Sequence, residues 1–439
     1  MNKNLNQIRH KTKLSLSQFL NLYQNSISKP VFKFLASMIF GIIKHKHIHL
    51  AKISRALNES IVVKKTNERL SYHLGKKGLY KTLFHSHLNT IASQISDCRF
   101  IIYDDSDVIK PYAKKIQGLS KVRDASKSNK DKTVTGNGFL WGNLLGITQK
   151  DEKIIPIRSE IISPILDEDC KYSTNKKFLS IIQEVSPVLN KKQILVLDRG
   201  FDRITIIEPL VKAKRDFIIR MTSKRHLHYK GENLPIKQVC KKADLNYTYT
   251  VNRIHKQKIV KRNFQVGALK VYLPTEDKKG IIDKAFWLVV AKEVNKGYSW
   301  FLSTVEAETE KEIVELVMKG YQYRWKIEEF HRQVKQDYCI EDILYQRYEA
   351  IQNISAILTI IMSFLAQFSK IFIFTILKVC KLLEKNRIKD IPVYYYYRLA
   401  EAFKILFLNN FINFNPVLDT FPEEPSLFPD SNFKFFGGC

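Results

Sequence analysis

The chain has 439 residues, 45% of them hydrophobic, and its 72 lysines and arginines against 43 acidic residues give a formal net charge of +29. This length and composition exclude a small or disordered protein and predict a packed core with more than one domain. The excess of positive charge predicts a polyanionic partner, with nucleic acid favoured over an anionic membrane surface.

Two apolar runs are candidates for membrane spans, and both are expected to be buried helices instead. A span takes about 20 uninterrupted apolar residues, whereas residues 32–43 are too few and residues 356–379 contain Gln367, Ser369 and Lys370. The N-terminus has no features of a secretory signal. The six cysteines are scattered without CxxC spacing, so we expect neither a zinc site nor a disulfide framework, as in a reducing cytoplasm.

Residues 1–96 are predicted to be helical, because their apolar residues recur at helical spacing and glycines are few. Within them, residues 48–74 have the pattern of a helix, a turn and a basic helix. Such a pair can form a helix-turn-helix DNA-binding module, although helix pairs also occur as ordinary packing units.

An alternation of strands and helices follows, which is typical of an α/β layered domain. We expect strands at residues 98–107, 134–149, 153–162, 193–202 and 216–221, and helices at about 173–187 and 203–213.

Residues 222 to about 300 change character, with alternating segments such as "YTYTVNRI" and "LKVYLP" and frequent cations. We interpret them as an inserted β-rich subdomain. From residue 348 the chain is helical and apolar, and it ends in a tail rich in proline and phenylalanine.

Asp104 and Asp198 each follow an apolar strand, in "FIIYD" and "ILVLD". Strand ends of open α/β sheets are where active sites gather, although an aspartate there can also be a helix cap or a turn residue. Phosphoryl transfer with two Mg²⁺ ions about 3.5–4 Å apart needs about three carboxylates. These two aspartates would therefore need a third acid.

The segment "YQYRWKIEEFHRQVK" (321–335) supplies a candidate for that acid. At about 100° per residue on a helix, one stripe contains Tyr321, Arg324, Glu328 and Lys335. Glu329 falls outside the stripe. The alternative is a solvated helix face on which Arg324 and Glu328 form an ordinary i,i+4 ion pair.

These residues resemble a known family, the DDE insertion-sequence transposases of the YREK type (the IS-four family). The family signature is Tyr, two residues, Arg, three residues, Glu, six residues and Lys. It is matched at every spacing by Tyr321, Arg324, Glu328 and Lys335.

Other motifs extend the resemblance to about residues 98–345. The family's first aspartate stands as Asp-x-Ser/Thr after a strand, which "DDS" (104–106) satisfies with Asp104, Asp105 being the alternative. Its second is commonly followed by Arg-Gly-aromatic, as Asp198 is in "DRGF". Trp300, in "SWFLST", corresponds to a tryptophan that stacks on a flipped base in relatives; a core position is the alternative.

The resemblance implies an α/β fold with a ribonuclease-H-like core and a β-subdomain inserted between the second aspartate and the glutamate. The implied domains are a helical DNA-end-binding domain at 1–96, a catalytic domain at 97–347 with its insertion at about 222–300, and a helical C-terminal region at 348–439. The apolar helices at 350–380 are a candidate dimerisation surface, and packing on the core is the alternative.

The resemblance also implies roles for the site residues. The catalytic acids would be Asp104, Asp198 and Glu328, which would bind Mg²⁺, with Mn²⁺ as a substitute. The implied DNA contacts are Trp300, Tyr321, Arg324 and Lys335. The expected partners are double-stranded DNA, at the element's terminal inverted repeats and at the target, and a second copy of the chain. We expect a bacterial, cytoplasmic, nucleoid-associated protein.

The function implied is metal-dependent DNA cleavage and strand transfer at the ends of an insertion sequence. Two alternatives remain open, namely a catalytically decayed or co-opted DNA-binding protein and a nuclease of the same fold that only hydrolyses. The intact acids favour activity, and the YREK pattern favours transposition over simple hydrolysis.

Overall fold

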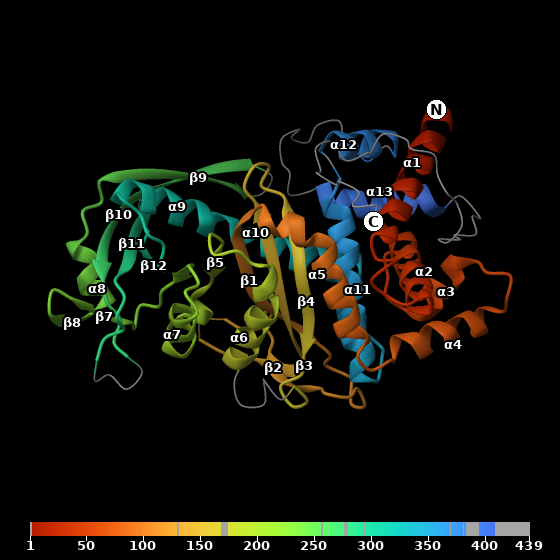
Figure 1. Ribbon diagram of the computed structural model, residues 1–439, viewed down its shortest axis with the longest axis horizontal. Coiled ribbons are helices and arrows are strands. Elements are labelled where there is room, and N and C mark those ends of the chain that lie inside the picture. The colour runs from red at the N-terminus through yellow and green to blue at the C-terminus, as the bar shows by residue number, and fades with distance from the viewer. Residues whose placement is uncertain are drawn as a thin grey trace, which may run out of the picture.

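The computed structural model describes residues 2–129, 131–167, 174–255, 258–275, 280–293, 296–368, 370–380, 382 and 395–408. A long mixed sheet runs across the molecule, and helices from both ends of the chain gather beside β3 and β4 (Figure 1).

The N-terminal region is helical, as predicted. Its helices are α1 (Asn2–Asn21), α2 (Lys29–His45), α3 (Leu50–Leu57), α4 (Val63–Leu74) and α5 (Leu79–Ser96). The apolar residues of α2 are almost all buried. α3 and α4 are separated by a short turn that begins at Asn58, which adopts the left-handed conformation (φ 48°). The expected helix, turn and basic helix at 48–74 are thereby confirmed as local structure.

The sheet has the strand order β2-β3-β1-β5-β6-β12-β11-β10-β9, with β4 on the far side of β3. Its first six strands in chain order are β1 (Cys98–Ile109), β2 (Ser120–Arg123), β3 (Thr135–Thr148), β4 (Ile154–Ile162), β5 (Ile194–Leu197) and β6 (Phe217–Arg220). β1, β5 and β6 are parallel to one another, whereas β3 is antiparallel to β1 and to β4. The alternating strands and helices predicted for this region are present.

Helices cover both faces of this part of the sheet. Phe100 of β1 packs against Tyr323 of α9 (Glu310–Tyr323), whereas Tyr103 packs against Phe178 of α6 (Thr174–Val185). Because side chains alternate along a strand, α9 and α6 lie on opposite faces. α7 (Ile204–Lys212) packs beside α6, and α10 (Trp325–Asp337) contacts β1 and α9.

The β-rich insertion expected at about 222–300 is present as strands β7 to β12, and most of these strands share the main sheet; a separate subdomain stays a prediction. Four of its strands continue the main sheet, and they are β9 (Tyr247–His255), β10 (Lys258–Val271), β11 (Phe286–Glu293) and β12 (Tyr298–Ser303). β12 pairs antiparallel with β6, so it satisfies the backbone groups of an edge that would otherwise be open. A small second sheet contains β7 (His226–Tyr229) and β8 (Glu232–Pro235), followed by the short helix α8 (Ile236–Val239). Alternation along a strand cannot reveal which sheet the strand joins.

The C-terminal region is helical in its described part, with α11 (Tyr348–Ala366), α12 (Lys370–Val379) and α13 (Tyr395–Leu408). α11 packs against β4, α5 and α2. By length and composition α11 could cross a bilayer, but 89% of its most apolar stretch is buried within the protein. The buried helix was predicted correctly. The side chains of α11 are almost all buried within this chain, which favours core packing for this helix; dimerisation through residues 350–380 stays a prediction. The proline- and phenylalanine-rich tail lies outside the described residues.

Candidate active site

Two aspartates lie level with each other on neighbouring parallel strands. The register of β1 and β5 pairs Ile102 with Val196, and Asp104 and Asp198 each follow two residues later. β1 itself continues to Ile109 because its other edge pairs with β3, where Asp104 is opposite Asn143. Asp104 therefore stands within β1, at the point where pairing with β5 ends, and not at the strand end that was predicted.

Glu328 lies on α10, and the side chain of Arg324 connects it to Asp104. Arg324 Nη1 donates to Asp104 Oδ2 (3.3 Å), and Arg324 Nη2 donates to Glu328 Oε1. The arginine side chain is only 12% exposed. One guanidinium thus joins an acid of the sheet to an acid of the helix.

Tyr321 connects the second aspartate to the same group. Its hydroxyl donates to Asp198 Oδ1 at 2.8 Å, and its ring centroid lies 5.6 Å from Arg324 Cζ. The ring packs against Phe301 of β12, with 4.7 Å between centroids. We call Asp104, Asp198 and Glu328 with Arg324 the acidic cluster.

The helix that carries these residues is not continuous, which corrects the uniform stripe expected over 321–335. α9 ends at Tyr323 and α10 begins at Trp325, with Arg324 between them at helical dihedral angles. The turn between β3 and β4 holds this junction, because Tyr323 donates to the Glu152 carboxylate and Lys326 donates to the Glu152 carbonyl.

Gly320 allows the close approach of α9 to the sheet just before Tyr321. A Cβ at this position would lie 2.6 Å from Phe100 Cε1 and 2.8 Å from Ile218 Cδ1, which is closer than van der Waals contact permits. A side chain here would push the helix outward and move the Tyr321 hydroxyl away from Asp198.

Asp104 and Asp105 lie on different faces of β1. Asp104 contacts Arg324, on the face covered by α9 and α10. Asp105 shares the face of Tyr103, which packs on α6. Asp104 is therefore the member of the pair that joins the acidic cluster.

The protonation properties of the two aspartates differ. Burial and the neighbouring Asp105 raise the pKa of Asp104 to about 8, against the opposing effect of Arg324. Burial also acts to raise the pKa of Asp198, but Arg324, the Arg199 backbone N–H and the Tyr321 hydroxyl outweigh it, and the pKa is lowered. Of these two carboxyl groups, Asp104 is therefore the one whose ionised form is disfavoured in the folded protein.

Three other predicted residues lie away from these contacts. Lys335 forms an ion pair with Glu341 (2.9 Å) at the far end of α10. Glu329, expected outside the stripe, pairs with Arg332 (3.3 Å). Trp300 is half-buried in β12, and because its neighbour Phe301 packs on Tyr321, alternation directs Trp300 to the opposite face of the sheet.

A polar contact that the sequence did not reveal anchors α10 to the sheet. Asn143 Nδ2 donates to His331 Nε2 at 3.0 Å, and the His331 ring lies 5.2 Å from that of Trp141. Burial, with Lys335 and Arg324 nearby, lowers the pKa of His331 to about 3, so the ring is neutral and can accept this hydrogen bond. The only signal in the sequence was a polar residue, Asn143, within an apolar strand.

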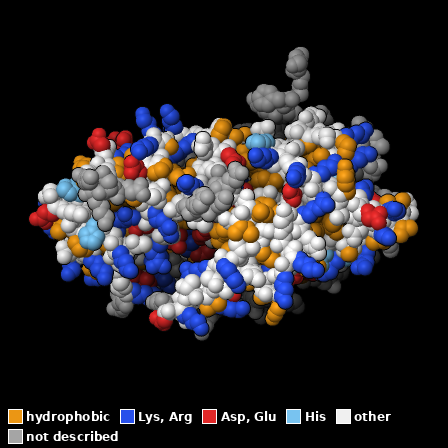
Figure 2. Space-filling view, turned by 90° about the horizontal axis from the view of Figure 1, so that it is seen from below, with side chains coloured by type: hydrophobic (Ala, Val, Ile, Leu, Met, Phe, Trp, Pro, Cys, Tyr) orange, Lys and Arg blue, Asp and Glu red, His pale blue; other side chains and the backbone are white. Residues whose placement is uncertain are grey.

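The surface around the sheet is rich in cations. In Figure 2, lysine and arginine side chains are spread over the lower face and border a hollow in which acidic side chains are visible. This pattern agrees with the overall formal charge of +29 and suits a polyanion.

Comparison with known proteins gives one family match. Residues 160–364 match the family model of the transposase DDE domain. The matched range contains Asp198 and Glu328 and begins after Asp104. No curated protein matches the chain. The match supports a DDE transposase.

Proposed function

We propose that the protein is an insertion-sequence transposase of the YREK type, with a ribonuclease-H-like core that cleaves DNA at the ends of its element and joins them to a target. The observation that carries this proposal is the meeting of Asp104, Asp198 and Glu328 around Arg324. Support comes from the match of residues 160–364 to the transposase DDE domain and from the parallel strands β1, β5 and β6 with helices on both faces.

The acidic cluster fits divalent cations. Mg²⁺ prefers carboxylate oxygens, and the cluster offers Asp104, Asp198 and Glu328 against one contacting guanidinium. Burial, and after it the charge of Asp105, raises the pKa of Asp104 in spite of Arg324, and a divalent cation would favour the ionised form. Bound Mg²⁺ would supply activation of the attacking oxygen and stabilisation of the leaving one. We assign the three acids as its ligands, with Mn²⁺ as a substitute.

The remaining residues of the signature position the acids and the DNA. The Tyr321 hydroxyl fixes the orientation of the Asp198 carboxylate. Arg324 holds Asp104 and Glu328 in the protein without DNA, and its guanidinium is then available to a phosphate of the scissile strand. Lys335 contacts the phosphate backbone farther along α10. Trp300 lies on the face of β12 opposite to Phe301 and Tyr321, so the base that it is assigned to stack on would have to reach that face. Two copies of the chain pair two element ends.

The N-terminal helices are assigned to binding of the element ends. The first turns of α4 are exposed and carry Lys64 and Lys65. Between α2 and α4 lies a groove of about 290 Å³ lined by Lys29, Lys33 and Arg69, among others. Cations on one surface suit DNA phosphates, and an exposed second helix suits the major groove.

The decisive experiment uses DNA that carries the inverted repeats flanking the gene, with Mg²⁺, and follows both nicking and joining. We expect Glu328→Gln to lower cleavage at least about a hundredfold, because even residues that only support metal ligands contribute about 10–100-fold, while end binding is kept. Glu329→Gln, whose side chain pairs with Arg332, is the matched control and should cleave normally.

Each alternative function gives a different outcome. A hydrolysis-only nuclease would cut the ends without joining them to a target, and a decayed DNA-binding protein would bind the ends without cutting. Loss of cleavage in Glu329→Gln with normal cleavage in Glu328→Gln would contradict the assignment of the third acid.

A further inference from the structure

The N-terminal helices meet the end of α10 at a polar junction. Residues 46–49, between α2 and α3, lie against residues 337–345, which follow α10. Lys46 Nζ pairs with Asp337 (2.8 Å), and the Tyr345 hydroxyl donates to the Ile48 carbonyl. The junction thus joins the region assigned to DNA ends to the helix that carries Glu328.

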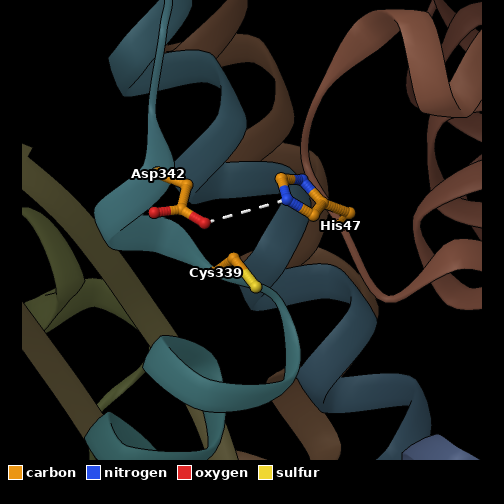
Figure 3. A group of neighbouring side chains, drawn as sticks. All are labelled: His47, Cys339 and Asp342. Carbon is orange, nitrogen blue, oxygen red and sulfur yellow. Dashed lines mark ion pairs between the residues drawn. The ribbon is translucent and has the colours of Figure 1, made fainter.

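Three side chains of different chemistry converge at this junction. They are His47 from the α2–α3 connection and Cys339 and Asp342 from the segment after α10. One potential ligand atom from each residue lies within 4.8 Å of those of the other two. Figure 3 shows the Asp342 carboxylate directed toward the His47 ring, with Cys339 beneath them; His47 Nε2 and Asp342 Oδ2 are 3.8 Å apart.

The backbone at Cys339 is unusual in a way that serves this convergence. Cys339 has φ 55° and ψ 46°, the left-handed conformation, which residues with a Cβ rarely adopt. A 3-10 turn, Ile340–Asp342, follows directly. The reversal brings the thiol and the carboxylate of a Cys-x-x-Asp segment to the same side, and two-residue spacing is common between zinc ligands.

We propose that His47, Cys339 and Asp342 bind a Zn²⁺ ion, with water as the fourth ligand. Imidazole nitrogen, thiolate sulfur and carboxylate oxygen together are the donor set that zinc takes in proteins, whereas Mg²⁺ takes oxygen alone. Zinc ligands lie about 2.0–2.3 Å from the ion, so small side-chain rotations close the present spacing. The Asp342 side chain is 60% exposed, which leaves the fourth position open to solvent.

Binding has identifiable costs that the charges of the ligands offset. The Cys339 thiol releases its proton to solvent as the sulfur binds. His47 Nδ1 accepts the His49 backbone N–H at 3.2 Å; coordination through Nε2 moves the ring proton to Nδ1 and gives up that bond. Lys46 and Lys52 lie near the thiol. A thiolate and a carboxylate together neutralise Zn²⁺, so the occupied site is neutral beside these lysines.

The site would be a structural metal site and not a second catalytic centre. Its ligands come from two segments separated by almost 300 residues of chain, so the ion holds the N-terminal helices against the end of α10. This inference does not depend on the proposed function, because it concerns the junction and not the acidic cluster. It departs from the sequence-based expectation of no zinc site, which rested on the absence of paired cysteines.

The test measures metal binding and stability, without DNA. The Asp104→Asn full-length protein serves as the background, so that ions at the acidic cluster do not contribute. After removal of metals with a chelator, Zn²⁺ and Co²⁺ are titrated while melting temperature, bound metal and thiolate-to-cobalt absorption are recorded. The variants are Cys339→Ser, His47→Gln and the exposed Asp342→Asn, with Cys240→Ser, a buried free cysteine elsewhere, as the matched control.

We expect about one Zn²⁺ per chain, a rise in melting temperature on binding and a cobalt–thiolate band. Cys339→Ser should abolish the band, and each of the three variants should weaken zinc binding at least about tenfold, whereas Cys240→Ser should bind as the background does. Asp342→Asn keeps the test valid if a buried variant fails to fold. Absence of stoichiometric zinc binding, or binding unchanged in Asp342→Asn and Cys339→Ser, would overturn the proposal.

Discussion

Two buried groups of charged side chains lie on the same sheet, and they are organised differently. In the acidic cluster, Arg324 pairs with Asp104 and Glu328, and Tyr321 links Asp198 to them. On β4, Arg158 and Glu160 form a second group, which we call the β4 ion network, with Lys177 of α6 and Glu184. The comparison distinguishes buried charges that are paired within the fold from carboxylates that exceed the cations around them.

The β4 ion network is balanced. Arg158 pairs with Glu160 at 2.5 Å and with Glu184 at 2.7 Å, and Lys177 reaches Glu160 at 2.7 Å. Burial acts to raise the pKa of Glu160, but Arg158 and Lys177 outweigh it, and the pKa is lowered. The network contains two cations and two carboxylates, so its charges balance without a bound metal ion.

The acidic cluster is not balanced. Among the residues that the structure describes, its carboxylates form ion pairs with a single guanidinium, that of Arg324, and burial together with Asp105 raises the pKa of Asp104 to about 8. The pairing of each carboxylate with a cation, as in the β4 ion network, would stabilise the folded protein more than the acidic cluster does. Uncompensated carboxylates in a partly exposed site are instead what a cation-binding centre requires.

The largest effect on stability should come from breaking the balanced group. Arg158→Met leaves Glu160 buried without its main partner, and loss of one member of a buried pair costs about 3–5 kcal/mol. Urea unfolding should report this loss. Lys212→Met, which removes an exposed i,i+4 partner of Glu208, is the control and should change stability by about 0.5 kcal/mol or less. A small effect of Arg158→Met would mean that the network is not compensated as described.

Arg324→Ala should lower stability less than Arg158→Met does, and it should strengthen Mg²⁺ binding. Without divalent ions, removal of the guanidinium leaves the carboxylates facing one another and should lower the free energy of unfolding by about 1–3 kcal/mol. Because Arg324 occupies the space between Asp104 and Glu328, its removal should also tighten Mg²⁺ binding, as measured by titration.

Arg324→Lys keeps the charge without the forked geometry and serves as the control. It should lie between the wild type and Arg324→Ala in both measurements. Unchanged stability of metal-free Arg324→Ala would show that Arg324 does not neutralise the cluster.

The pH dependence of Asp104→Asn gives a smaller and more specific effect. Asp104 has a pKa of about 8 in the folded protein and about 4 when unfolded. Between these values the folded state holds a proton that the unfolded state has lost, so the contribution of Asp104 to stability falls as pH rises from about 4 to 8 and then levels off.

Without divalent ions, Asp104→Asn should therefore be more stable than the wild type at pH 8.5, and the difference should shrink toward pH 5. Melting curves across this range measure it. Asp151→Asn, at an exposed aspartate in the β3–β4 turn, should show no such trend. A difference independent of pH would indicate that Asp104 does not titrate in this range.

The sequence predicted the strands and helices of the sheet well, because strand residues such as those of β5 are continuously apolar. It did not predict that β12 would pair with β6 and carry the insertion into the main sheet. Pairing between distant strands depends on which edges remain open after the rest has folded, and period-two patterns such as "LKVYLP" do not encode the partner.

The sequence selected the residues that meet in the acidic cluster but not their contacts, and it also selected Lys335 and Trp300, which the structure places elsewhere. The spacing of Tyr321, Arg324 and Glu328 selected the residues that the structure gathers, since Arg324 and Glu328 are one turn apart. The break at Arg324 was missed because it depends on Glu152 in a distant turn. The junction at His47 was missed because its ligands are far apart in the chain and meet only through tertiary packing.

We expect the acidic cluster, and not the β4 ion network, to bind Mg²⁺. The most direct measurement is the shift in unfolding free energy on adding Mg²⁺ to the wild type, Glu328→Gln and Glu160→Gln. At a hundred times its Kd the ion should stabilise the wild type by about 2.7 kcal/mol. We expect Glu328→Gln to lose most of this gain, and Glu160→Gln to start less stable yet keep the whole gain. An equal gain in Glu328→Gln and the wild type would contradict the account.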